Sequence, residues 1–163
     1  GAAVARATIA ADAAGVRIEN RTVAGDDNRC WCDEARAAQA IDHVLRIALR
    51  ASPKGARVFV RAAPGASGWP EIHIRDRGEG LAPEEVRQAL AVFDEVHRGL
   101  DRSFAGPGVG FAIAKTFVEI QGGRFEIDSR QGQGVLVRIS LPRPEADVKT
   151  SESAGGEPVR MAG

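Results

Sequence analysis

The chain has 163 residues, with 22 basic and 22 acidic side chains and therefore no formal net charge. This length suits one domain with a sizeable core. The balanced charge argues against a nucleic-acid binder, which usually carries a basic excess, and the apolar runs are too short to span a bilayer. We see no signal peptide, so we expect a cytoplasmic protein or the cytoplasmic part of a membrane-associated sensor. The chain starts at Gly1 and its single methionine is Met161, which predicts a piece of a longer protein.

The first third of the chain alternates between helix and strand patterns. The predicted elements are a helix over 4–14, strands over 16–23 and 29–32, and a helix over 34–51. Gly15 suits the end of the first helix, Asp33 can cap the second, and Ser52-Pro53 ends it.

The rest of the chain predicts two strand pairs separated by helices. Strands over 56–63 and 70–78 flank a hairpin loop, and helices follow over 83–92 and 109–121 with a long loop over 94–107 between them. A closing hairpin covers 124–130 and 134–142. Strand pairs with helices between them suggest a mixed sheet with helices on one face. Residues 143–163 are rich in Pro, Glu, Ser, Gly and Ala, so we expect a disordered tail.

Two cysteines, Cys30 and Cys32, flank Trp31. A single C-x-C pair offers too few ligands for an ordinary zinc site, which needs four. On a strand, both thiols would point to one face and Trp31 to the other. We therefore expect two buried free thiols in a reducing cytosol.

Two patterns in the first half suit a ligand site. His43, Ile47 and Arg50 are spaced i, i+4 and i+7 along the predicted helix, off its main apolar stripe. The stretch "DRGEG", Asp76–Gly80, directly follows a strand. A carboxylate at a strand end, followed by glycines that let the backbone come close, can recognise an amino group on a base. A plain tight turn has the same kind of sequence.

The long loop before the last helix carries Phe93, His97 and Arg98. An aromatic residue at the base of a loop usually packs, and an exposed arginine is usually solvated. The functional alternative is a flexible lid with a cation for phosphate.

Three glycines, Gly106, Gly108 and Gly110, lead into the last helix. Free N–H groups at a helix start favour an anion such as phosphate. Lys115 lies too far into the helix for a P-loop, and a loop precedes the glycines where a dinucleotide-binding turn needs a strand.

Together and in this order, these features resemble the catalytic and ATP-binding domain of sensor histidine kinases, within the wider family that includes gyrase, Hsp90 and MutL. The resemblance covers residues 4–142, and we expect one domain over 1–142. Four segments carry it: 32–60 resembles the region through the N box, 74–86 the G1 box, 92–98 the F box, and 106–142 the G2 box with the closing hairpin.

The resemblance implies an α/β (α+β) two-layer sandwich, with a mixed, mostly antiparallel sheet of about five strands and three helices on one face. It implies that ATP lies between the helix layer and the lid. Asp76 would accept a hydrogen bond from the adenine amino group, while Gly78 and Gly80 would let the base approach.

On the phosphate side, the resemblance implies that Gly106, Gly108 and Gly110 shape the end of the lid and present N–H groups. Arg50 would approach the phosphates. Phe93 and Arg98 would belong to the lid side of the cofactor site.

The N box departs from the family pattern. Its two asparagines align with His43 and Ile47, and the second normally holds Mg²⁺ against the triphosphate. Mg²⁺ prefers oxygen ligands, whereas Ile47 has none and His43 offers nitrogen, which suits softer metals. His43 is thus a weak metal candidate, and Asp42 lies about 100° round the helix from it. Val135 and Gln121 are lesser departures, standing where Thr and His are usual.

The first hypothesis is therefore a domain that binds ATP but transfers phosphoryl groups poorly, with Mg²⁺ binding in doubt. The alternative is a pseudokinase module with weak or no ATP binding, loosely similar to DivL-like atypical kinases. An ordinary kinase with an unusual metal ligand is the third hypothesis. The implied partners are the protein's own dimerisation and phospho-acceptor domain, which this chain lacks, and a response regulator or phosphorelay protein. The parent protein would be a homodimer.

Overall fold

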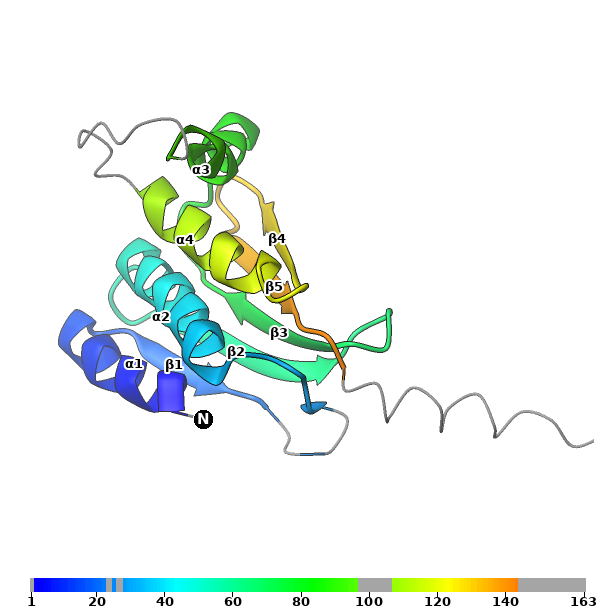
Figure 1. Cartoon of the computed structure of the whole chain (residues 1–163). Coiled ribbons are helices and arrows are strands. Elements are labelled where there is room, and N and C mark those ends of the chain that lie inside the picture. Colours follow the sequence, from blue (N-terminus) through cyan, green and yellow to red (C-terminus); the bar gives the residue numbers. More distant parts are fainter. Residues whose placement is uncertain (1, 23–24, 26–27, 97–106, 144–163) are drawn as a thin grey trace, which may run out of the picture.

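The computed structural model describes residues 2–22, 25, 28–96 and 107–143, which form a single sheet covered by helices (Figure 1). The helices are α1 (Ala2–Ala14), α2 (Glu34–Ala51), α3 (Pro83–Val96) and α4 (Pro107–Glu119), and the strands are β1 (Arg17–Asn20), β2 (Arg57–Pro64), β3 (Pro70–Arg75), β4 (Arg124–Ser129) and β5 (Val135–Ser140).

The sheet has five strands in the order β1-β2-β3-β5-β4. Strands β1 and β2 run parallel, and the other three pairings are antiparallel. The predicted mixed, mostly antiparallel sheet in a two-layer sandwich is therefore confirmed. The described part has four helices, not the three implied by the resemblance, because α1 adds to the layer by packing against α2 and β1 (Figure 1).

The core lies between the helix layer and one face of the sheet. Successive side chains along a strand point to opposite faces of the sheet, so every second residue points into the core. Accordingly, Val58 and Val60 of β2 and Val137 and Ile139 of β5 are almost fully buried. From the helix layer, α2 contributes an apolar face that includes Val44 and Leu45, and α4 contributes residues such as Phe111 and Val118. Helix α2 packs against both α1 and α4 and is therefore central to the layer.

The start of α2 is fixed as its sequence predicts. Asp33 is the N-cap residue, and its Oδ1 accepts a hydrogen bond from the backbone N–H of Arg36 at 3.1 Å. The N–H of Asp33 itself donates to Oε1 of Gln121 at 2.6 Å. The beginning of α2 is thus tied to the residues that follow α4.

The predicted strand over 29–32 is wrong. These residues form an irregular connection, in which the N–H of Trp31 donates to the carbonyl of Pro142 at 2.8 Å and the chain then turns into the cap of α2. A single bond to the end of β5 gives no ladder. The first strand is also shorter than predicted, and α3 continues to Val96, beyond the predicted end at residue 92.

The two cysteines are free, as predicted, but half-buried and not fully buried. Their sulfur atoms are 3.3 Å apart. Burial, followed by the contact with Cys32, raises the pKa of the Cys30 thiol to about 12. Trp31 between them is 76% exposed. In the described part of the chain, no helix is long and apolar enough to cross a membrane.

Candidate functional site

Asp76 lies directly after β3 and is buried, with 3% of its surface exposed. Its Oδ1 accepts hydrogen bonds from the backbone N–H groups of Gly78 at 2.8 Å and Val135 at 3.2 Å. Its own N–H donates to the carbonyl of Val135 at 3.0 Å. The carboxylate is therefore fixed through one oxygen, and Oδ2 makes no hydrogen bond to the residues that the structure describes. Such an oxygen can accept a hydrogen bond from a ligand amino group.

Opposing effects act on the protonation of Asp76. Burial raises the pKa of this carboxyl, while the N–H donors of Gly78 and Val135 and the charge of Arg75 act in the opposite direction. Burial is the largest of these effects. A buried acceptor at the open end of a strand is a feature of ligand sites more than of surface turns.

The glycines around Asp76 are needed for close packing of backbone on backbone. A Cβ on Gly78 would lie 2.5 Å from the carbonyl oxygen of Ala51, at the end of α2. Gly80 has a φ of 73° and its Cβ would meet the carbonyl of Arg130, and Gly134 would similarly meet the carbonyl of Asp76. These contacts give Gly78 and Gly80 a role in packing. Their predicted role in admitting a base stays a prediction.

Gly134 and Val135 are site residues that the sequence did not identify as such. Gly134 directly precedes β5 and Val135 begins it, and both contact Asp76 at the end of the neighbouring strand β3. The glycine-rich turn before β5 was visible in the sequence, but its pairing with the end of β3 depends on the strand order.

The three residues of the α2 stripe have different environments. His43 is half-buried, and its ring centroid is 6.5 Å from that of Phe117 on α4. Burial, together with the charge of Arg46, lowers the pKa of this imidazole, and Asp42 opposes the shift. Arg50 is exposed in the last turn of α2, next to Ala51, whose carbonyl contacts the Asp76–Gly80 loop.

Ile47 is only 6% exposed and lies between α2 and α4. A Cβ on Gly110 would lie 2.8 Å from Cδ1 of Ile47 and 3.3 Å from its Cγ1. The isoleucine therefore occupies the space in front of the first turn of α4. The position that the resemblance pairs with a metal-binding asparagine is thus apolar and packed, and its side chain offers no oxygen ligand for Mg²⁺.

Asp42 does not supply the missing oxygen ligand. Its carboxylate accepts a hydrogen bond from Arg6 of α1 at 2.8 Å, on the side of α2 away from α4. Within the described residues, no group of three or more His, Cys, Asp or Glu side chains could hold a metal ion. His43 therefore belongs to no such group among the described residues.

The glycine-rich segment before α4 is partly helical. The sequence predicted a loop over 94–107 and a helix from Val109, but α4 begins at Pro107. Proline at the first helical position explains this, because its fixed φ suits the first turn and it has no N–H to leave unpaired. Gly108 and Gly110 therefore lie in the first turn, where backbone N–H groups have no partner within the helix. These N–H groups keep the capacity to bind an anion.

The lid side of the predicted site is only partly described. Phe93 lies in α3, near its C-terminal end. Arg98 and Gly106 lie outside the described residues.

This arrangement defines a class of protein: a mixed five-stranded sheet under one helix layer, with a buried acceptor at the end of β3 and the start of α4 lying beside α2. A family model described as "Histidine kinase-, DNA gyrase B-, and HSP90-like ATPase" matches residues 32–145. The chain belongs to this family, HATPase_c, the ATP-binding domain of histidine kinases. The sequence-based assignment is confirmed.

Individual relatives of this chain, a histidine kinase and a sensor protein among them, agree with the family assignment. The chain is 28% identical over 134 residues to the histidine protein kinase DivJ, and 35% identical over 113 residues to the sensor protein DivL, both from Caulobacter vibrioides. These alignments cover 82% and 69% of this chain but only 22% and 14% of the relatives. The solved structure of the mycobacterial sensor histidine kinase MprB superimposes with a TM-score of 0.65 at 29% identity, covering 87% of this chain and 91% of that one.

Proposed function

We propose that this chain is the nucleotide-binding domain of a two-component sensor kinase, and that it binds adenine nucleotide but transfers the γ-phosphoryl group poorly. Family membership supports ATP as the ligand. The observation that carries the impairment is the position of Ile47, which is buried against Gly110 where the family places a metal-binding asparagine.

The adenine side of the site retains its chemistry. Two backbone donors hold Oδ1 of Asp76, so Oδ2 can accept from the exocyclic amino group of adenine without reorganisation. Binding to a prearranged acceptor costs little ordering entropy. The first-turn N–H groups of α4 and the guanidinium of Arg50 offer positive charge to the phosphates.

The phosphate side lacks the element that makes transfer efficient. Phosphoryl transfer depends on a divalent ion that bridges the phosphates and neutralises developing charge. At residue 47 this chain presents a methyl group. Asp42, the nearest carboxylate on α2, is paired with Arg6. Nucleotide affinity would then depend mainly on the adenine contact and on the helix start.

We propose that the whole protein acts in two-component signalling as a sensor kinase, as the names of its relatives suggest. DivJ and WalK are a histidine protein kinase and a sensor histidine kinase, and this chain spans about a fifth of their length. We infer a parent protein that dimerises through a separate phospho-acceptor domain and communicates with a response regulator.

The alternative is a pseudokinase module that binds nucleotide weakly or not at all and acts by docking on its partners. The same packing favours it, since Ile47 and the His43–Phe117 contact replace polar surface between α2 and α4 with apolar surface.

Calorimetric titration of the chain with ATP separates these functions. The proposal predicts the same affinity in Mg²⁺ and in EDTA. Tight binding that disappears in EDTA would contradict it and indicate an ordinary kinase site. If ATP and ADP both fail to bind under either condition, the pseudokinase alternative replaces it.

A further inference from the structure

The face of the sheet opposite the helix layer, here called the open sheet face, carries many arginines. Strand pairing puts alternate residues of each strand on this face: Arg61 of β2, His73 of β3, Arg138 of β5 and Glu126 of β4 follow one another across the sheet. The inward-facing neighbours of these residues include the core residues Val60, Ile74, Val137 and Phe125.

The carboxylates on the open sheet face are already paired. Glu19 contacts Arg21 at 2.6 Å and Arg57 at 3.4 Å. Arg138 lies 3.6 Å from Asp128 and 4.0 Å from Glu126. Glu71 is 3.0 Å from His73. Six exposed arginines on or bordering this face have no carboxylate partner within the described residues: Arg17, Arg61, Arg75, Arg77, Arg124 and Arg130.

This imbalance is local, because the chain as a whole is neutral. Unpaired arginines on one face create a positive potential that attracts an acidic partner. The carboxylates on the same face interrupt the positive charge of these arginines with regions of opposite sign. The face would therefore not attract every anion equally.

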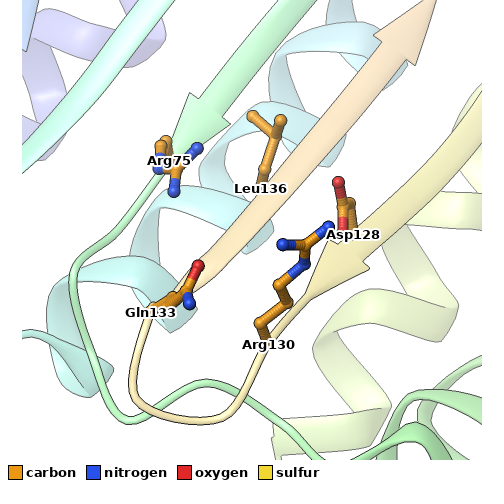
Figure 2. A pocket seen from close by; sticks show the side chains of 6 residues that line it. Arg75, Asp128, Arg130, Gln133 and Leu136 are labelled. Atoms are coloured by element: carbon orange, nitrogen blue, oxygen red, sulfur yellow. The ribbon is translucent and has the colours of Figure 1, made fainter.

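A recess of about 210 Å³ on this face provides a specific anchor. Arg75, Leu136 and Asp128 are register neighbours on β3, β5 and β4, and Figure 2 shows their side chains on the side of the sheet away from the helices. Arg130 and Gln133, from the β4–β5 turn, close the end of the recess (Figure 2).

The lining suits a carboxylate side chain. Arginine binds carboxylate through two parallel N–H donors, Gln133 adds an amide donor, and half-buried Leu136 offers apolar contact for a methylene group. Asp128 would repel an entering carboxylate, but its charge is partly compensated by Arg138 at 3.6 Å.

The surroundings favour a protein segment over other polyanions. The ring of Phe59, the aromatic residue on β2 of this face, has Arg21 and Arg77 over it at 4.7 and 5.4 Å, which leaves little room for a nucleobase to stack. The large exposed hydrophobic side chains of the described residues are Ile9, Trp31 and Ile120, which lie outside the sheet, so this face offers none for insertion into a membrane. A mixed pattern of charges matches a partner that also carries both signs.

We propose that the open sheet face docks an acidic protein segment, with an Asp or Glu side chain seated between Arg75 and Arg130. This recess adjoins the candidate nucleotide site at Gly134 and Arg75, but it opens on the face of the sheet away from the helices, so the inference does not depend on the proposed function. It supplies a second contact through which a partner domain would hold this one.

Fluorescence anisotropy with a fluorescein-labelled Glu-Ser repeat peptide tests the proposal on the full chain. We expect binding that weakens with added salt, and about tenfold weaker binding for Arg75→Ala/Arg130→Ala, since each of two exposed ion pairs contributes about threefold in affinity. The matched control, Arg46→Ala/Arg87→Ala, removes two exposed arginines from α2 and α3 and should change affinity less than twofold. Circular dichroism melting curves check that both variants fold.

Two results would overturn the proposal. Equal weakening in both double variants would mean that only net charge matters. Failure of the peptide to bind, while an oligo-dT strand or phosphatidylserine vesicles bind and lose binding in Arg75→Ala/Arg130→Ala, would assign the face to nucleic acid or to a membrane. A charge reversal adds a positive test: Arg75→Glu/Arg130→Glu should lose the acidic peptide and gain a Lys-Ser repeat peptide.

Discussion

Ile47 and Gly110 are matched across the α2–α4 interface: Cδ1 of the isoleucine lies 2.8 Å from the place where a Cβ on the glycine would be. The Ile47 side chain fits there only because Gly110 has no side chain. Both residues belong to segments that resemble the family's N and G2 boxes. Under the proposed function, the contact that packs the helix layer would therefore remove polar space from the phosphate side of the site.

This match predicts a coupling between the two positions. Gly110→Ala should be destabilising in the presence of isoleucine, because the new methyl group overlaps Cδ1, although alanine's helix propensity offsets part of the cost. Ile47→Val removes Cδ1 and should relieve the overlap. Urea unfolding of the two single variants and the double variant should give a coupling free energy of about 1 kcal/mol. Strict additivity of the two changes would contradict the contact.

Two substitutions of Asp76 should separate folding from ligand binding. Asp76→Asn keeps an oxygen for the N–H groups of Gly78 and Val135 and removes a buried charge, so its free energy of unfolding should equal or exceed that of the wild type. Its amide NH₂ would face the adenine amino group, and displacement of a fluorescent ATP analogue should show about tenfold weaker binding.

Asp76→Ala should lose both stability and nucleotide affinity. It leaves two buried backbone donors without an acceptor, at a cost of about 1–3 kcal/mol each. If Asp76→Asn binds nucleotide as well as the wild type does, the proposed role of Asp76 in adenine recognition is wrong.

The β4–β5 turn offers a matched pair of glycines for testing the support of Asp76. Gly132 and Gly134 have φ values of 76° and 78°, so alanine suffers similar backbone strain at both, about 1 kcal/mol. Only at Gly134 would the new Cβ also meet the backbone and Oδ1 of Asp76, while at Gly132 nothing lies within 4 Å. Thermal denaturation should show a much larger loss for Gly134→Ala. Similar losses of thermal stability in both variants would mean that backbone strain alone accounts for the effect.

The fold was largely predictable because its signals are local. Alternation in β2 and β5, the cap at Asp33 and the apolar face of α2 each follow from spacing within one element. The strand predicted over 29–32 failed because four alternating residues cannot reveal whether a partner strand is available. The start of α4 was misplaced because the glycines outweighed the helix-starting effect of Pro107.

The site was predictable only in part. Asp76, His43, Ile47 and Arg50 were singled out first by spacing and position and then by resemblance to family motifs, but neither predicts how buried each side chain is. The paired arrangement of Ile47 with Gly110 joins residues far apart in the chain, and it depends on how closely α2 and α4 approach. The open sheet face was hidden for a similar reason: its arginines are scattered through a neutral sequence and come together only through strand register.

His43 should make the domain less stable in mild acid. Its folded pKa is lowered by burial, so below the ordinary histidine value of about 6.5 the unfolded chain binds more protons than the folded one. The free energy of unfolding should therefore fall as pH decreases from about 6.5 through the lowered folded pKa. His43→Asn should reduce that slope, measured by urea unfolding at neutral and mildly acidic pH. An unchanged slope would show that His43 titrates alike in both states.

The central claim, that Ile47 excludes the metal from the phosphate side, is tested most directly by restoring the oxygen ligand. Ile47→Asn, with Ile47→Val as a control for lost volume, should be titrated calorimetrically with ATP in Mg²⁺ and in EDTA. We predict that wild type and Ile47→Val bind equally in both conditions, while Ile47→Asn binds more tightly in Mg²⁺ than in EDTA. Metal-dependent binding by the wild type, or no gain of metal dependence in a folded Ile47→Asn variant, would contradict this account.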